Sequence, residues 1–173
     1  MEAKNSNHSK QVMIKNGLFL GIASVLISVA VYVSGNSFNQ HWSVGVFTFA
    51  LNVFFIALAI KQFKTANEGF LSLSESFKIG LGVAVIAGLI SGIYTYIFLN
   101  FVEPDFFVQM QAHMEQQWMK QGLSDQDIEN AKAIMQKTSG PFATIAFSII
   151  ATIFFGFIIS LVTGLIMKQK REE

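Results

Sequence analysis

The sequence predicts an all-α membrane protein: four transmembrane helices in a bundle, with an extracytoplasmic amphipathic helical hairpin between the third and fourth spans. Three observations support this fold class: four long apolar stretches without ionisable side chains, a low content of charged residues, and small residues at regular spacing within the stretches. The stretches cover residues 17–33, 42–60, 79–102 and 138–167 of one predicted domain, residues 1–173. At about 1.5 Å of rise per residue, each can cross a hydrocarbon layer of about 30 Å as a helix.

The composition agrees with a chain whose main environment is the lipid bilayer. Hydrophobic residues make up 52% of the chain and charged residues 13%, whereas about a quarter of the residues of a soluble domain are charged. The formal net charge of +1 is too small to indicate nucleic acid as a partner. The absence of cysteine excludes disulfides, thiolate metal sites and cysteine nucleophiles.

The first apolar stretch follows a basic leader, which raises the alternative of a cleavable signal peptide. The stretch is longer than the apolar core of a signal peptide, which has about 7–15 residues. It ends in Tyr32-Val33-Ser34-Gly35, which lacks an A-x-A-like cleavage pattern. We therefore expect it to remain in the protein as the first transmembrane helix.

The basic residues predict the orientation of the bundle. If both termini lie on one side, nine basic residues flank the spans on that side and three lie in the outer loops. Because lysine and arginine accumulate on the cytoplasmic side, both termini are expected to be cytoplasmic. The nine are Lys4, Lys10, Lys15, Lys61, Lys64, Lys78, Lys168, Lys170 and Arg171, and the three are Lys120, Lys132 and Lys137.

Small residues give the third and fourth spans one face each that is almost free of side chains. On the third span they are Gly80, Ala84, Gly88 and Gly92, and on the fourth they are Ser148, Thr152, Gly156, Ser160 and Gly164. Such stripes let two helix backbones approach closely and gain dispersion contacts. We expect the two stripes to meet inside one bundle, with homodimerisation through Gly88 and Gly92 as the alternative.

Asn52 is the one strongly polar side chain near the middle of a span. An amide in hydrocarbon needs a hydrogen-bond partner, so we expect Asn52 to bond a neighbouring helix; contact with a passing ion or substrate is the alternative. No predicted span contains an ionisable residue. This absence disfavours a proton-driven transporter, since such proteins place charged groups within the membrane.

The inner connection, residues 62–78, leads into the third span. Ser74 and Ser76 lie just before that span and can cap the free N–H groups at its start. The apolar residues of the connection are expected to lie at the membrane surface as a short amphipathic piece; they are Phe70, Leu71, Leu73 and Phe77.

The outer loop, residues 103–137, is long enough for two helices. Pro104 suits the first helical position, Gly122 ends the first helix and Ser124 caps the second. The apolar residues form stripes that can face each other, the membrane surface or a partner. The candidate partner surface consists of Phe107, Met110, Met114, Trp118 and Ile128.

No pattern of catalytic or ligand-binding residues stands out. The chain lacks a P-loop, a nucleophile elbow and an H-E-x-x-H motif. Asp125, Asp127 and Glu129 alternate as at the start of a calcium loop, but the turn glycine is absent and a helix cap explains them better. His41 and His113 lack the short spacing of zinc ligands. We predict no catalytic residue, metal or cofactor.

Several short motifs occur in an order that resembles the DUF4199 family, small four-span bacterial membrane proteins of unknown function. The motifs are Gly69–Gly82 (GFLSLSESFKIGLG), Tyr94-x-Tyr96, Val102-Glu103-Pro104-Asp105-Phe106, and Met114…Met119…Gly122-Leu123-Ser124…Ile128-Glu129. The resemblance implies a bacterial inner (cytoplasmic) membrane protein with an extracytoplasmic helical insert. It implies no activity and no catalytic residues.

Three functions are compatible with the sequence. We rank first a non-enzymatic membrane component that binds a partner protein or a lipid, either as a homo-oligomer or with another membrane protein. The second is a small transporter or channel component that works as an oligomer, with a pore lined by Asn52, Thr152, Ser160 and Tyr96. The third is a membrane enzyme that acts on lipid through outer carboxylates such as Glu103 and Asp105.

Overall fold

The structure, a computed structural model, describes residues 2–169 and confirms the predicted all-α fold class. Four long helices contain the four candidate membrane spans: α1 (Glu2–Val33), α2 (Trp42–Ala66), α3 (Leu73–Ile97) and α6 (Pro141–Met167). A short π-helical segment, η1 (Phe98–Val102), continues α3. The helices α4 (Phe106–Lys120) and α5 (Asp125–Thr138) lie between the third and fourth spans.

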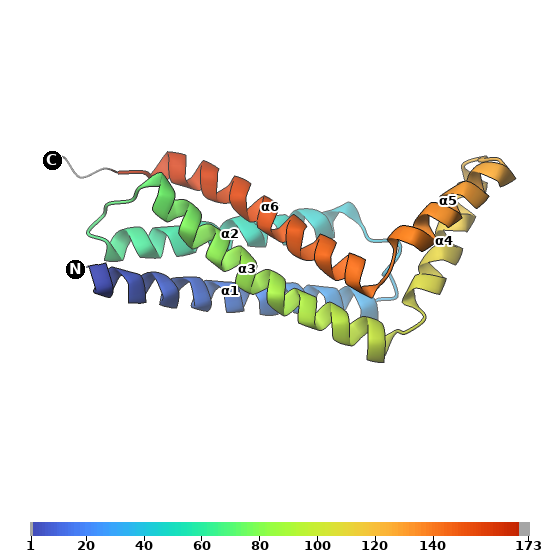
Figure 1. The fold of residues 1–173 in the computed structure, drawn as a ribbon, viewed down its shortest axis with the longest axis horizontal. Helices are drawn as coiled ribbons and strands as arrows, with labels where there is room; N and C mark the ends of the chain where they lie inside the picture. The colour runs from blue at the N-terminus through green and yellow to red at the C-terminus, as the bar shows by residue number, and fades with distance from the viewer. Residues whose placement is uncertain (1, 170–173) are drawn as a thin grey trace.

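The spanning helices alternate in direction, so both chain termini lie at one end of the bundle and the α4–α5 hairpin lies at the other (Figure 1). We name these the terminal end and the hairpin end. Helix α3 contacts all three other spanning helices, and α2 also contacts α1 and α6. The hairpin leans away from the long axis of the bundle (Figure 1).

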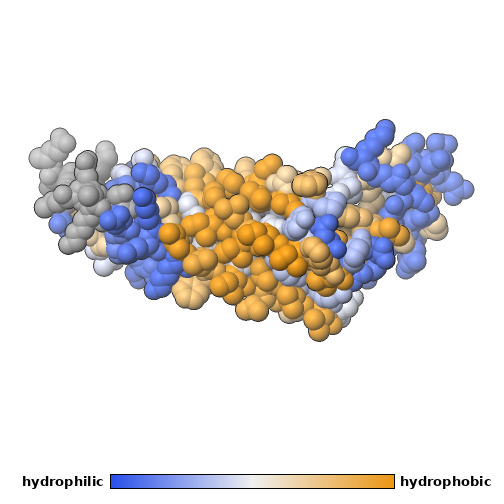
Figure 2. All heavy atoms as spheres, turned by 60° about the horizontal axis from the view of Figure 1, so that its bottom comes forward, coloured by the Kyte–Doolittle hydropathy of each residue, from blue (hydrophilic) through white to orange (hydrophobic). Residues whose placement is uncertain are grey.

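An apolar belt covers the middle of the bundle between two polar ends on the face shown in Figure 2. Its exposed side chains are mainly large, with contributions from all four spanning helices, including Phe19, Phe54, Leu89 and Phe147. Monomeric soluble proteins rarely expose a continuous apolar patch of more than a few hundred Å². A belt of this extent therefore identifies the hydrocarbon core of a membrane as the environment of these helices.

Three spanning helices continue beyond the predicted apolar stretches at the terminal end. Helix α1 begins at Glu2 instead of residue 17, α2 continues past residue 60 to Ala66, and α3 begins at Leu73 instead of residue 79. A helix satisfies its own backbone hydrogen bonds, so it passes from lipid into water without interruption. Hydropathy marks the membrane-embedded part of a helix but not its ends. Lys170 and Arg171, part of the predicted charge bias, lie outside the described residues.

The start of α3 differs from the prediction. Ser72 is the N-cap: its hydroxyl accepts a hydrogen bond from the Glu75 backbone N–H, and the Glu75 carboxylate accepts one from the Ser72 backbone N–H. Ser74 and Ser76 lie inside the helix, so their prediction as caps is wrong. Ser72 is the N-cap because Glu75, three residues later, completes a capping box. The Ser76 hydroxyl instead donates to the Ser160 carbonyl oxygen at 2.9 Å.

The connection between α2 and α3 is fastened to the segment that follows α6. Leu71 and Gln169 form an isolated antiparallel bridge with two backbone hydrogen bonds of 2.9 Å. Leu71 is fully buried, so it does not lie at the membrane surface as the sequence suggested. This bridge closes the terminal end of the bundle by joining α3 and α6 through their flanking segments.

Small residues bring α3 and α6 into close contact near the terminal end. A Cβ atom added to Gly156 would lie 2.5 Å from the Ala84 Cβ, closer than real Cβ atoms approach. A Cβ atom on Gly164 would lie 2.6 Å from the Ser76 Oγ. A Cβ atom on Gly80 would overlap the Ser160 side chain. The structure therefore places the two small-residue stripes against each other within one chain.

Toward the hairpin end the same two helices remain in contact at ordinary distances. A Cβ atom on Gly88 would lie 3.8 Å from the Thr152 Cβ, and one on Gly92 would lie 3.4 Å from the Ile145 Cγ2. Ser148, the last member of the α6 stripe, donates its hydroxyl to the Ile145 carbonyl oxygen. Gly88 and Gly92 are buried within the chain, which makes them unavailable for the alternative homodimer contact.

We predict that Gly80→Ala destabilises the protein, whereas Gly88→Ala does not. The added methyl group at Gly80 would collide with the Ser160 side chain and force α3 from α6, at a cost of about 1–3 kcal/mol. At Gly88 the methyl group would make an ordinary contact. Thermal unfolding in detergent would compare the two variants with the native chain. Equal unfolding temperatures for the two variants would contradict the close α3–α6 packing at Gly80.

Candidate functional site

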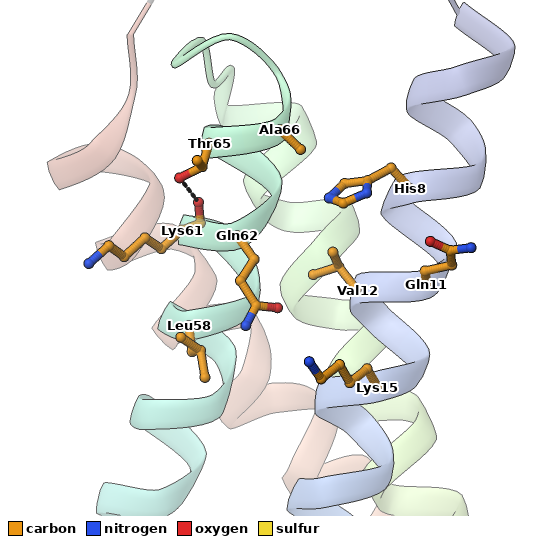
Figure 3. A pocket seen from close by; sticks show the side chains of 9 residues that line it. All are labelled: His8, Gln11, Val12, Lys15, Leu58, Lys61, Gln62, Thr65 and Ala66. Atoms are coloured by element: carbon orange, nitrogen blue, oxygen red, sulfur yellow. Dashed lines mark hydrogen bonds between the residues drawn. The ribbon is translucent and has the colours of Figure 1, made fainter.

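A cleft of about 560 Å³ lies between α1 and α2 at the terminal end (Figure 3). Its lining residues recur every three or four positions on each helix, which places them on one face of each. Helix α1 contributes His8, Gln11, Val12 and Lys15, and helix α2 contributes Leu58, Lys61, Gln62, Thr65 and Ala66. The cleft is therefore formed by two helix faces and its geometry depends on how α1 and α2 are held together.

A buried amide joins the two helices beside the cleft. Asn16, which is 1% exposed, donates hydrogen bonds to the Gln62 side-chain oxygen at 2.9 Å and to the Val12 carbonyl oxygen at 2.8 Å. About one turn further toward the middle of the bundle, the Phe19 and Phe55 rings stack with their centroids 6.4 Å apart. These contacts fix the separation of α1 and α2 at the inner margin of the cleft.

The lining of the cleft is basic. It contains two lysines and a histidine, and none of the described lining residues is a carboxylate. In Figure 3, His8 and the Lys15 ammonium group extend from α1 toward α2, whereas Lys61 extends along the rim, away from α1. The His8 Nε2 is buried and has no hydrogen-bond partner among the described residues. A buried polar atom without a partner is unfavourable, so a ligand that bonds this nitrogen would remove that cost.

The remaining walls of the cleft are largely aliphatic. Val12, Leu58 and Ala66 contribute apolar side chains, and the lysine side chains add their methylene stems. A hollow that combines such walls with a few nitrogen donors suits a molecule with both an apolar part and a polar, negatively charged part. The arrangement offers binding groups but no nucleophile paired with a base.

At the hairpin end, the first outer loop attaches α4 to the bundle. The Phe38 ring centroid lies 5.2 Å from that of Phe106 and 5.5 Å from that of His113. The Glu103 carboxylate accepts a hydrogen bond of 2.8 Å from the Tyr32 hydroxyl. The hairpin is thus connected to α1 and to the first loop by a small set of side chains near its base.

The caps of the hairpin helices agree in part with the prediction. Ser124 is the N-cap of α5 and accepts a hydrogen bond from the Asp127 backbone N–H, as expected. Helix α4 begins at Phe106 with Asp105 at the N-cap position, so the prediction of Pro104 at the first helical position is wrong. Pro104 lies in the turn between η1 and α4, where its fixed φ suits a turn equally well.

The predicted partner surface is only partly accessible. Ile128 is 5% exposed, so it packs inside the hairpin and does not belong to an open surface. The other four residues are half-buried; they are Phe107, Met110, Met114 and Trp118. A second hollow of about 450 Å³ lies between α4 and α5, where Lys132 and Glu115 form an ion pair of 2.8 Å. The large apolar side chains that the hairpin does expose are Val108, Met119, Leu123 and Ile134.

Two other polar residues from the sequence analysis bond locally. Asn52 donates its amide to the Thr48 carbonyl oxygen of its own helix at 2.9 Å, so the expected bond to a neighbouring helix is replaced by one within α2. His41 is the N-cap of α2 and accepts a hydrogen bond from the Ser43 backbone N–H. Within residues 2–169, no group of three or more histidine, aspartate or glutamate side chains is placed to hold a metal ion.

The cleft was not predicted from the sequence. Lys15 and Lys61 indicate orientation there, and neither His8 nor Gln62 belongs to a recognisable motif. A helical-face pattern was nevertheless present, because His8 and Lys15 lie two turns apart and Lys61 and Thr65 lie one turn apart. The sequence does not indicate that these faces of α1 and α2 lie opposite each other.

The four spans, the apolar belt and the short extramembrane hairpin define a multi-pass helical membrane protein. More particularly, the chain belongs to the DUF4199 family, described as a protein of unknown function, whose family model matches residues 15–169. This match confirms the family resemblance. No curated protein and no solved structure matches the chain. The matched region contains Lys15 and the whole α2 side of the cleft, while His8 precedes it.

We predict that Phe38→Ala loosens the hairpin without unfolding the bundle. The substitution removes the ring contacts to Phe106 and His113, and each aromatic pair contributes about 0.5–1.5 kcal/mol. Amide hydrogen exchange in α4 should become about tenfold faster, while exchange in α3 and α6 should stay unchanged. Phe142→Ala is the control, because Phe142 is 83% exposed. If α4 exchanges at the same rate in both variants, the loop does not hold the hairpin.

Proposed function

We propose that this chain is a non-enzymatic membrane component that binds a lipid of the surrounding bilayer in the α1–α2 cleft. One observation carries the proposal: the cleft combines aliphatic walls with His8 and Lys15 directed into it, at the margin of the apolar belt. That margin is where the headgroup and the acyl chains of a lipid meet. The cleft therefore offers matching surfaces to both parts of one molecule.

The positions of the outer carboxylates favour binding over lipid chemistry. Both carboxylate oxygens of Glu103 already accept hydrogen bonds, one from the Tyr32 hydroxyl at 2.8 Å and one from the Gln109 amide at 2.5 Å. Asp105 lies at the N-cap position of α4, but its side chain makes no capping hydrogen bond. Glu103 is thus held at the base of the hairpin, whereas a general acid or base would need a free oxygen directed at a substrate.

The residues suggested for a pore do not support a transport path through one chain. Ser160 is buried in the contact with Gly80, where a single added carbon atom would collide. Tyr96 is 48% exposed on the apolar surface. Asn52 bonds the backbone of its own helix. Because these three residues lie apart and do not line one path, they favour a binding protein over a channel component.

For the setting of the protein, we propose the bacterial inner membrane with both termini in the cytoplasm. The bias of basic residues supports this orientation. Six lysines with described side chains lie toward the terminal end and three lie on the hairpin; the six are Lys10, Lys15, Lys61, Lys64, Lys78 and Lys168, and the three are Lys120, Lys132 and Lys137. The cleft would then open at the cytoplasmic leaflet.

The orientation can be tested with single cysteines, because the native chain has none. Gln126→Cys places a thiol on the exposed hairpin, and Thr65→Cys places one on the exposed terminal end. In intact bacterial cells whose inner membrane remains sealed, an impermeant thiol reagent in the periplasm should label Cys at 126 and leave Cys at 65 unlabelled until the membrane is opened. The opposite pattern would reverse the proposed sidedness.

Lipid binding can be tested by native mass spectrometry of the full chain released from lipid nanodiscs. The native protein is expected to retain one lipid after the bulk lipids have dissociated. Ala66→Trp fills the cleft with an indole ring and should reduce that retention to background. Ala50→Trp is the matched control, since Ala50 is also exposed on α2 but does not line the cleft. Equal retention by all three proteins would contradict the proposal.

A further inference from the structure

We infer that the α1–α2 cleft binds the phosphate group of an anionic lipid, which is held by His8 and Lys15. The inference rests on the proposed function and goes further, because it names the class of lipid and the atoms that recognise it. The shared chemistry is a phosphate oxygen with a full negative charge. Two sources could supply it, a lipid headgroup or free phosphate, and the structure favours the headgroup.

The first observation is the unpartnered nitrogen of His8. His8 lines the cleft, and its Nε2 is buried with no hydrogen-bond partner among the described residues. As an N–H donor, this nitrogen needs an acceptor, and a phosphate oxygen is among the strongest available. Among the described residues that line the cleft, none is acidic, so none offers a carboxylate for this role.

The second observation is the position of Lys15 relative to His8. The two residues lie two turns apart on α1, which separates their Cα atoms by about 10.5 Å along the helix axis. Side chains on a helix lean toward its N-terminus, so the long Lys15 side chain reaches back toward His8. Figure 3 shows its ammonium group directed toward the cleft. One phosphate can therefore lie between the two nitrogens.

The charge around the cleft distinguishes between lipid headgroups. Lys61 adds a second full positive charge at the rim, where it extends away from α1, and none of the described lining residues is acidic. A headgroup with net negative charge gains from both lysines. A zwitterionic headgroup brings its own cation toward them and gains less. The cleft should therefore prefer a lipid whose phosphate is the only charge.

The surface beside the cleft, toward the middle of the bundle, suits the acyl chains of the lipid. Phe19 follows Lys15 by one turn, is 53% exposed, and stacks on Phe55 of α2. This ring pair continues the aliphatic walls of the cleft into the apolar belt. A phosphate at the level of Lys15 would thus have its acyl chains along an apolar surface, whereas free phosphate would gain nothing from it.

The test compares phosphatidylglycerol with phosphatidylcholine in nanodiscs that hold the full chain, again by native mass spectrometry. The native protein should retain phosphatidylglycerol in preference. Lys15→Gln should reduce this preference about fivefold, the effect of one lysine near an anionic headgroup. Lys10→Gln is the matched control: it removes the same charge from the same helix at an exposed position outside the cleft, and should leave the preference unchanged.

His8→Phe keeps a ring of similar size but removes the nitrogen, and it should also reduce the preference. If His8→Phe leaves it unchanged, the assignment of Nε2 is overturned. If Lys10→Gln reduces it as much as Lys15→Gln does, binding is a general effect of charge and the site is overturned. Displacement of the retained lipid by millimolar inorganic phosphate would identify free phosphate as the ligand and overturn the lipid assignment.

The two levels of the proposal can fail separately. If both lipids are retained equally, and Ala66→Trp abolishes that retention, the protein binds lipid but does not select a headgroup with net negative charge. If no lipid is retained by the native chain, lipid binding itself is contradicted. Thermal unfolding of each variant in detergent must match the native chain, and a variant that unfolds early would be replaced by the Lys61→Gln rim variant, for which a smaller loss of preference is expected.

Discussion

In a bilayer, lipid tails are as apolar as the side chains on a helix, so helices gain little by exchanging lipid contacts for contacts with one another. Close approach of backbones is what makes helix association favourable, and it requires residues without bulky side chains. The contact between α3 and α6 meets this requirement, with Gly80 against Ser160 and Ala84 against Gly156. The buried hydrogen bond from the Ser76 hydroxyl to the Ser160 carbonyl oxygen adds a directional link. Because α3 also contacts α1 and α2, the position of every other span depends on this pair.

The cleft between α1 and α2 lies where the close packing of the spanning helices ends. Most of the fully buried apolar residues come from the second half of α2 and the first half of α3, for example Ile56, Ile60 and Val83. The Asn16–Gln62 hydrogen bond fastens α1 to α2 at the margin of this core. Beyond it α1 directs His8 and Lys15 into the cleft, whereas Lys61 of α2 extends along the rim. An anion within the cleft would offset the charge of Lys15, so the electrostatics of the cleft favour one kind of occupant.

Much of the fold could be predicted from the sequence because hydropathy and small-residue spacing are local properties. They gave the four spans, the hairpin and the two stripes of α3 and α6. Helix ends were less predictable, since a cap depends on reciprocal bonds such as those of Ser72 and Glu75. The tightest glycine contacts were not predictable either, because they depend on the register of two helices: Gly80 lies closer to α6 than the Gly88–Gly92 motif does. The cleft was not predictable because it depends on contacts between two helices, such as that of Asn16 with Gln62. No local sequence pattern indicates such a contact.

Basic residues at the ends of membrane helices are usually interpreted as signals of orientation, and that interpretation explains Lys10 and Lys64 as well as Lys15 and Lys61. The structure separates these lysines by the face of the helix on which each one lies. Lys15 and Lys61 line the space between α1 and α2, whereas Lys10 and Lys64 do not. In the proposed orientation all four would lie near the level of the lipid phosphates, where the attraction that sets the orientation acts. Where two such residues lie on neighbouring helices, beside the His8 nitrogen that has no partner among the described residues, we propose that the general attraction to an anionic membrane surface becomes a defined site for one lipid.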